Sequence, residues 1–115
     1  MQTHKDLIVW KESMQFVKQI YAATAKFPKD EIYGLISQLR RAVVSIPVNI
    51  SEGAARNSKK EYIHFLYISL GSISEVETLL LIAGDQDYVQ ADQFLKTIED
   101  LRKKLLNLIK YLKGK

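Results

Sequence analysis

Apolar residues recur along the chain every three or four positions, which is the spacing of one face of an α-helix. In the first segment this spacing is kept by Trp10, Met14, Val17 and Tyr21. The pattern ends at Phe27-Pro28, because the residue before a proline avoids the helical region. The spacing therefore predicts a first helix over about residues 7–26.

A second helix is predicted over about residues 30–56. Asp30 and Glu31 fall in its first turn, where carboxylates suit the positive end of the helix dipole. Pro47 lies deep inside it and removes one backbone hydrogen bond, so we expect a bend there. The alternative is a true break with a new helix that begins at Pro47. The apolar stripe stays in phase across Pro47, which favours the bend.

Two further helices are predicted, over about residues 58–83 and 90–112. The third begins with Ser58-Lys59-Lys60-Glu61, the pattern of a capping box, and Gly84 is a plausible stop. The fourth keeps an unbroken four-three rhythm that is typical of the seam of a helical bundle. That seam consists of Phe94, Ile98, Leu101, Leu105, Leu108 and Leu112.

Four helices joined by short connections favour antiparallel packing of neighbours along the chain. The sequence therefore predicts an all-α, up-down-up-down four-helix bundle with its second helix bent at Pro47. A length of 115 residues fits one domain over residues 1–115.

The third helix carries more apolar residues than one buried face requires. A contiguous apolar patch on the outside usually marks an interface, so we expect a homo-oligomer. The alternative is that helix rotation or the C-terminal tail covers these residues. The predicted interface residues are Ile63, Tyr67, Leu70, Leu81, Leu95, Leu106 and Ile109.

A ladder of polar residues runs through the second helix at helical spacing. We interpret it as a structural network that fixes the register of the second helix against the third, a known use of buried polar groups. Antiparallel geometry makes Arg41 and Glu75 candidate partners, with Arg40 in reserve. The network is predicted to contain Arg41, Ser45, Asn49, Glu52, Ser72 and Glu75.

Gly53 lies in the same helix, where glycine is about 1 kcal/mol less favourable than alanine. We attribute it to the close approach of another helix. A remote alternative for the ladder is an enzyme that uses Glu52, Arg41 and Asn49, which would require a pocket.

Composition narrows the class of protein. The chain has no cysteine, so disulfides and thiolate metal sites are excluded. Its N-terminus lacks the apolar core of a signal peptide, and its longest purely apolar run, Leu79 to Ala83, is too short for a membrane span. We therefore expect a cytoplasmic protein with no membrane role.

The chain carries 17 basic and 13 acidic residues, a net charge of +4. Such an excess permits nucleic-acid binding but is also common on solvated helices. The candidate contacts are Arg56, Lys59 and Lys60 at one end of the bundle, and Arg102, Lys103, Lys104 and Lys110 on the last helix.

Glu61 and His64 have the E-x-x-H spacing used by di-iron bundles. Those bundles need two such motifs and two more inward glutamates, and the other histidine, His4, has no matching glutamate. We expect no metal ligand, no cofactor, no catalytic residue and no small-molecule substrate.

Several segments together are similar to one known family. They are Trp10, Phe27-Pro28, Tyr33-Gly34-Leu35, Gln38 to Ala42, Ser45 to Gly53, Arg56, Phe65-Leu66 and Gly71 to Glu77. The chain resembles the bacterial four-helix-bundle proteins encoded in intervening sequences of 23S ribosomal RNA genes. A related bundle is the accessory protein of diversity-generating retroelements, a basic pentameric barrel that works with a reverse transcriptase and RNA.

The resemblance implies an up-down bundle that forms a ring-like homo-oligomer, a homopentamer, and has no established enzymatic activity. By analogy we expect it to bind RNA or DNA through its basic surface. The alternative is a scaffold for protein–protein interaction that has no nucleic-acid role. Its binding would depend on apolar surface and not on the lysines.

Overall fold

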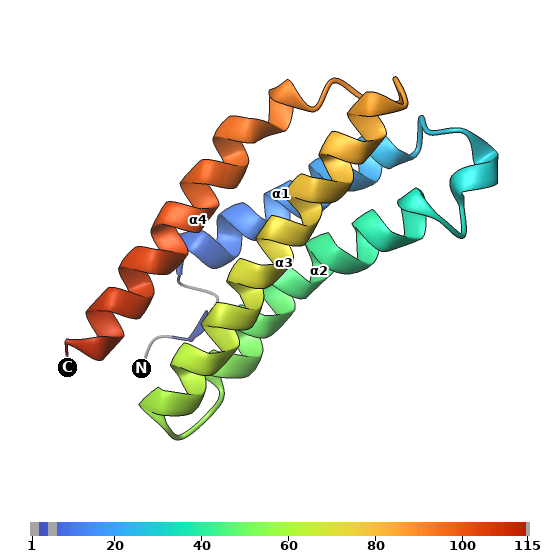
Figure 1. Cartoon of the computed structure of the whole chain (residues 1–115). Coiled ribbons are helices and arrows are strands. Elements are labelled where there is room, and N and C mark those ends of the chain that lie inside the picture. Colours follow the sequence, from blue (N-terminus) through green and yellow to red (C-terminus); the bar gives the residue numbers. More distant parts are fainter. Residues whose placement is uncertain (1–2, 5–6, 115) are drawn as a thin grey trace.

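The computed structural model describes residues 3–4 and 7–114. All the regular secondary structure within that part of the chain is helical (Figure 1). The elements are α1 (Ile8–Thr24), the short 3-10 helix η2 (Lys29–Glu31), α2 (Leu35–Ala54), α3 (Lys59–Asp85) and α4 (Asp92–Lys113).

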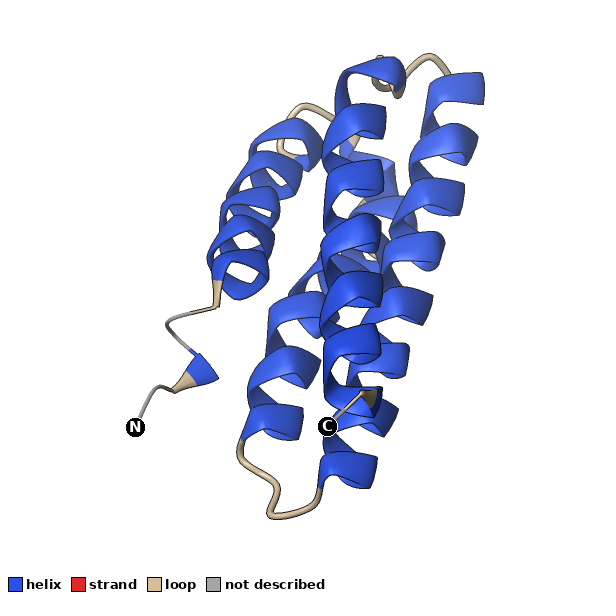
Figure 2. Cartoon of the chain, turned by 90° about the vertical axis from the view of Figure 1, so that its left-hand side faces the viewer, coloured by secondary structure: helices blue, strands red, loops and turns tan. Residues whose placement is uncertain are grey.

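The four α-helices form an elongated bundle of 46 × 22 × 20 Å. Each helix packs against its neighbour along the chain, and α1 also packs against α4, which closes the square (Figures 1 and 2). Successive helices run in opposite directions. The prediction of an all-α, up-down-up-down four-helix bundle is confirmed.

One apolar core runs the length of the bundle, and all four helices contribute to it. Its largest side chains have almost no exposed surface. They include Phe16 and Ile20 of α1, Leu39, Ile46 and Ile50 of α2, Leu66, Ile73 and Leu80 of α3, and Ile98, Leu101 and Leu105 of α4.

The ends of α1, α3 and α4 lie within about two residues of their predicted positions. The second helix is different, because it begins at Leu35 and not at Asp30. Residues 29–31 form the 3-10 turn instead, and Gly34 precedes α2 in a non-helical conformation. The Glu31 carboxylate still serves the helix start, since its Oε1 accepts a hydrogen bond of 3.1 Å from the Leu35 amide.

Pro47 lies within a continuous helix, since α2 runs from Leu35 to Ala54 without interruption. The alternative of a new helix that begins at Pro47 is therefore wrong. The proline is buried, and so are Val43, Ile46 and Ile50 around it.

The start of α3 agrees with its capping pattern. The Ser58 hydroxyl accepts a 3.0 Å hydrogen bond from the Glu61 amide, which satisfies one of the free N–H groups of the first turn. Among the described residues, α3 is the one helix long and apolar enough to cross a membrane on length and composition alone. Here it lies between α2 and α4 with one face in the core, and bundle helices of this kind pass the same test.

The α1–α2 and α3–α4 connections meet at one end of the bundle. Phe27 and Tyr88 pack with ring centroids 5.6 Å apart, and the Tyr88 hydroxyl donates a 3.2 Å hydrogen bond to Glu31. Partial burial and the neighbouring Glu31 carboxylate both raise the pKa of Tyr88 above its ordinary value. The phenol therefore stays protonated and can serve as the donor in this contact.

Candidate functional site

The polar residues between α2 and α3 form a short chain of hydrogen bonds. Asn49 Nδ2 donates to Ser45 Oγ at 2.9 Å, and Ser45 Oγ lies 2.8 Å from Ser72 Oγ. Ser72 Oγ in turn donates to the Ile68 carbonyl at 3.1 Å, so the Ser45 hydroxyl is the donor between the two serines. This directional chain ties α2 to α3 in one register.

A second contact between the same helices lies one turn along. Buried Ser69 donates from Oγ to the Ile46 carbonyl, at 2.9 Å. Gly53 is also buried in this interface, and a Cβ added there would lie 2.9 Å from atoms of both Phe65 and Tyr62. The structure thus provides the close helix approach that was predicted for Gly53.

The outer members of the predicted polar network do not join it. Arg41 and Glu75 are both exposed, and no ion pair links them. Arg40 packs against α1 instead: its Nε donates to Thr24 Oγ1 at 2.9 Å, and its guanidinium lies over the Tyr21 ring. The expected Arg41–Glu75 pairing is wrong because both side chains point to solvent.

Glu52 is also on the surface, where it forms an exposed ion pair of 3.4 Å with Arg56. Arg41, Asn49 and Glu52 therefore do not converge, and no hydrogen bond joins these three residues. This arrangement gives no support to the remote hypothesis of an enzyme built from them.

Three of the predicted cationic contacts already have a carboxylate partner, namely Arg56, Arg102 and Lys104. Arg102 on α4 bonds Glu77 at 2.8 Å and also contacts Glu99, and its side chain is only 23% exposed. Lys104 forms an ion pair with Glu12 of α1. Glu99 is three residues from Arg102 and could be paired with it from sequence spacing, whereas Glu77 and Glu12 lie 25 and 92 residues from their partners and could not.

The other candidate cations, Lys59, Lys60, Lys103 and Lys110, are exposed and form no ion pair within the described part of the chain. Lys113 was not among the predicted contacts. Its Nζ donates to the Tyr67 hydroxyl at 3.0 Å, which places the last turn of α4 beside the first turns of α3. Lys113 follows Lys110 by three residues, or about one helical turn, and this spacing could have pointed to it as a further cation.

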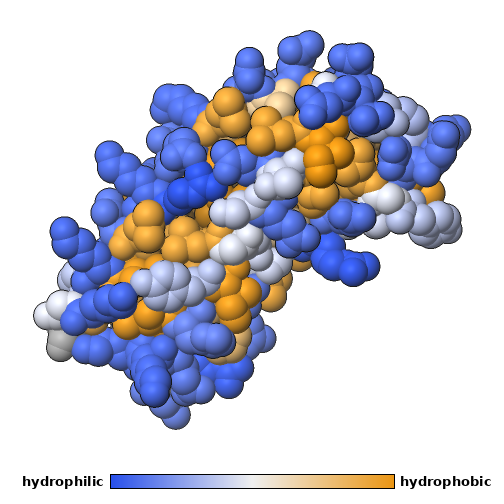
Figure 3. All heavy atoms as spheres, viewed as in Figure 1, coloured by the Kyte–Doolittle hydropathy of each residue, from blue (hydrophilic) through white to orange (hydrophobic). Residues whose placement is uncertain are grey.

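Apolar side chains gather on the outer face of α3 and α4 (Figure 3). Of the predicted interface residues, Leu81, Leu106 and Tyr67 are 50%, 47% and 46% exposed. Half-buried Ile63, Leu70 and Leu95 lie between these and the core. We call these six residues the α3–α4 face. Ile109 does not belong to it, because it is 3% exposed and part of the core.

A second apolar surface was not predicted from the sequence, because the helical spacing placed Trp10, Met14 and Val17 on one helix face but did not single out Val44 or Val48. It lines a pocket of about 310 Å³ between α1 and α2. Met14 and Val48 remain 43% and 48% exposed there. We call this surface the α1–α2 face, and its apolar residues are Trp10, Met14, Val17, Val44, Pro47 and Val48.

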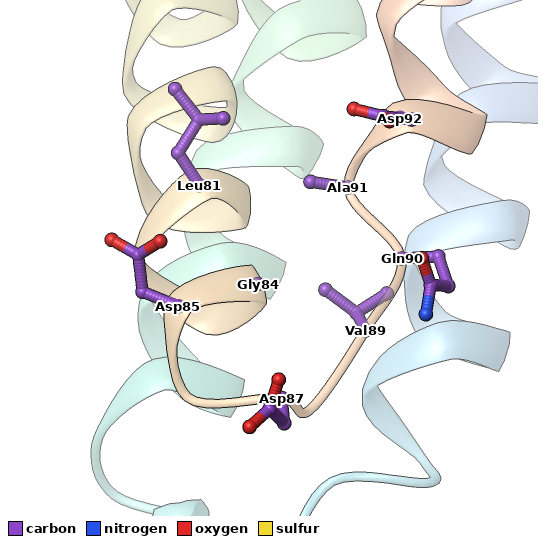
Figure 4. Close-up of a pocket in the computed structure, with 8 residues that line it drawn as sticks. All are labelled: Leu81, Gly84, Asp85, Asp87, Val89, Gln90, Ala91 and Asp92. Carbon is purple, nitrogen blue, oxygen red and sulfur yellow. The ribbon is translucent and has the colours of Figure 1, made fainter.

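A second hollow lies beside the α3–α4 turn, between Leu81, Gly84, Val89 and Ala91 (Figure 4). Asp85, Asp87 and Asp92 line it as well, but their carboxylates point in different directions (Figure 4). Within residues 3–4 and 7–114, no group of three or more histidine, cysteine or acidic residues is arranged to hold a metal ion. Glu61 and His64 are exposed, and His64 packs edge-on against Phe65.

The chain has recognisable relatives. The sequence model of the family described as 23S rRNA-intervening sequence protein matches residues 5–112. The fold is similar to the crystal structure of a protein with unknown function from the S23 ribosomal protein family of Bacteroides thetaiotaomicron VPI-5482. The two are 26% identical with a TM-score of 0.79, over 90% of this chain and 96% of that chain. No curated protein matches the sequence.

Proposed function

This chain belongs to the 23S rRNA-intervening sequence protein family, and from that premise we propose that it is a non-enzymatic, cytoplasmic protein that assembles into a homo-oligomeric ring and contacts nucleic acid through its basic surface. The observation that carries the assembly is the presence of two exposed apolar faces on one small bundle. An isolated molecule would leave both in water, and patches of that kind usually mark interfaces.

The positions of the two faces favour a ring over a simple dimer. The α1–α2 face and the α3–α4 face lie on opposite sides of the square of helices. Self-association through one face alone would leave the other face exposed to solvent. Pairing of unlike faces buries both, and it closes into a ring when the rotation between copies allows. Five copies are what the family resemblance leads us to expect.

Substitutions on the two faces test this assembly. Leu81→Lys with Leu106→Lys places charge on one face, and Met14→Lys with Val48→Lys places it on the other. Either variant should abolish the ring, as measured by light scattering coupled to gel filtration. Gln15→Lys, at an exposed polar position of α1 outside both faces, is the matched control and should assemble normally.

Mixing the two variants separates unlike-face pairing from like-face pairing. With unlike faces, each variant alone is a monomer and the mixture forms a dimer through the one intact pair of faces. With like faces, each variant alone still dimerises through its unaltered face. A wild-type protein that is monomeric at tens of micromolar would overturn the assembly altogether.

The contact with nucleic acid is supported by cations that have no carboxylate partner. Lys59, Lys60, Lys103 and Lys110 are exposed and form no ion pair with any described residue, whereas Arg56, Arg102 and Lys104 are paired with glutamates. A ring would repeat the free cations around its axis. Such contacts are made to phosphates, so the affinity should fall steeply with salt, with a log–log slope of about −0.7 to −0.9 per contact.

A labelled RNA oligonucleotide titrated at several salt concentrations tests this part. Absence of affinity at low salt would count against it. The competing hypothesis is a protein scaffold whose partner binds apolar surface. It predicts that charge reversal at Lys59 and Lys60 leaves partner capture intact.

A further inference from the structure

We propose that a single-stranded nucleic acid binds across one end of the bundle, which we call the cationic end. It comprises residues 52–61, around the α2–α3 turn, and residues 110–113, in the last turn of α4. This inference rests on the proposed function and adds to it the place of the contact and the form of the ligand.

The two ends of the molecule carry opposite charge. The cationic end holds two carboxylates, Glu52 and Glu61, against five cations, which are Arg56, Lys59, Lys60, Lys110 and Lys113. The opposite end, residues 26–31 and 85–92, has the reverse balance. It holds two cations, Lys26 and Lys29, against five carboxylates, which are Asp30, Glu31, Asp85, Asp87 and Asp92.

The two segments of the cationic end are neighbours in space. The hydrogen bond from Lys113 to Tyr67 joins the end of α4 to the beginning of α3. The α2–α3 turn and the C-terminus lie at the same end of the molecule in both views (Figures 1 and 2).

The middle of α4 is a weaker candidate for the same ligand. Arg102 and Lys104 are occupied by Glu77, Glu99 and Glu12, and Lys96 pairs with Asp100. A phosphate would have to displace those carboxylates. At the end of the bundle Lys59, Lys60 and Lys110 need no such exchange, and Arg56 shares one exposed carboxylate, that of Glu52.

Aromatic rings accompany the cations at this end. The Arg56 guanidinium lies 4.8 Å from the centre of the Phe65 ring, and its ion pair with Glu52 is exposed. Lys113 lies 5.3 Å from the centre of the Tyr67 ring, but Tyr67 belongs to the α3–α4 face and is covered in the proposed ring. A guanidinium that stacks on phenylalanine through one face presents its other face to an unpaired base. Bases inside a duplex are not available for such stacking, so the Arg56–Phe65 pair favours a single strand.

Charge reversal at the end is the first experiment. Lys59→Glu with Lys60→Glu should weaken binding of a single-stranded RNA about tenfold or more, and should reduce the salt slope by about 0.7 for each contact removed. Lys26→Glu with Lys29→Glu changes the net charge equally at the opposite end and should leave the affinity nearly unchanged. Binding is measured by fluorescence anisotropy of the labelled strand.

Arg56→Lys is the second experiment, because it keeps the charge and removes the planar group. It should weaken single-strand binding about fivefold, which corresponds to the lower end of the binding energy lost when one stacked base is removed. The slope of affinity against salt should not change. Binding of a duplex of the same sequence should be unaffected.

Each contrary result has a distinct meaning. Wild-type protein that binds no RNA at low salt overturns the proposed function and this inference with it. Equal losses in the two charge-reversal variants overturn the location alone. A duplex bound as tightly as the single strand, with no effect of Arg56→Lys, overturns the single-strand preference. A change of oligomeric mass in Lys59→Glu with Lys60→Glu would assign this end to contacts with the acidic end of another copy.

Discussion

Gly53 shows how closely single residues are fitted between α2 and α3. Both Phe65 and Tyr62 lie where its Cβ would be, so the two backbones approach more closely there than any other residue would allow. The sequence predicted this from the unfavourable helix propensity of glycine alone. It gave no hint of which residues would fill the space.

Substituting Gly53→Ala should therefore destabilise the bundle, although alanine is the better helix former. Overpacking of a tight interface typically costs about 1–3 kcal/mol, which exceeds the gain of about 1 kcal/mol in propensity. Urea unfolding at fixed protein concentration measures the difference. An unfolding midpoint above that of the wild type would show that the helices can move apart freely.

The polar network makes a second prediction for single residues. Ser72→Ala removes the acceptor of the Ser45 hydroxyl and should lower the free energy of unfolding by about 1 kcal/mol. Ser51→Ala is a suitable control, since the Ser51 hydroxyl bonds only its own helix. Equal effects of the two substitutions would mean that the contact between helices contributes nothing.

The prediction from sequence was correct for Ser45, Asn49 and Ser72, which form the network. It was wrong for Arg41, Glu52 and Glu75, which lie on the surface. Residues four apart on a helix drift by about 40° around the axis at each step. Ser45 and Asn49 thus both reach the α3 side, whereas Arg41, a further step away, has turned to solvent. Spacing alone could not show where along this drift the interface ends.

Helix ends illustrate what the sequence determines at the scale of an element. The start of α3 was predictable because Ser58 and Glu61 form a local capping pattern that needs no tertiary contact. The start of α2 was not, because Asp30 and Glu31 suit a helix start equally well as first-turn residues or as preceding caps. Glu31 takes the second role here and caps Leu35 from a separate turn.

Removal of the α3 cap should have a measurable effect. Ser58→Ala leaves the Glu61 amide without its acceptor and should lower stability by about 1 kcal/mol, while Ser58→Asp retains an acceptor and should restore most of it. Thermal unfolding followed by circular dichroism compares the three proteins. If alanine and aspartate behave alike, water replaces the cap without loss.

Gly71 gives a contrasting prediction in the middle of the same helix. Apart from its chain neighbours and the nearby backbone of α3 itself, no described atom lies within 4 Å of the position its Cβ would occupy. Gly71→Ala should therefore raise the free energy of unfolding by about 1 kcal/mol through helix propensity. A loss of stability or of assembly would show that another chain approaches this position closely.

The whole molecule was predictable in outline because its topology follows from short connections and helical periodicity. The excess of apolar residues on α3 was also visible in the sequence. Of the residues predicted to lie on the α3–α4 face, Ile109 of α4 is the one that is buried in the core. The sequence did not show which cations would form ion pairs across the bundle and which would stay free. This depends on contacts such as Lys104 with Glu12, which only the packing of α1 on α4 creates.

Assembly and nucleic-acid binding should respond oppositely to salt. The two apolar faces carry few charges, so the oligomer should persist in about 1 M salt, where electrostatic interactions are screened within about 3 Å. Binding of RNA should be lost under the same conditions. Sedimentation velocity with and without labelled RNA measures both at once, and dissociation of the ring by salt would show that charge pairs, not apolar surface, hold it together.

The separation of cations and carboxylates to opposite ends has a practical consequence. On a negatively charged support, such as mica or a cation-exchange resin, the bundle should stand upright and not lie flat, with the turn around Asp87 facing away from the support. A fluorophore or tether attached near that turn would leave the opposite end of the molecule unobstructed.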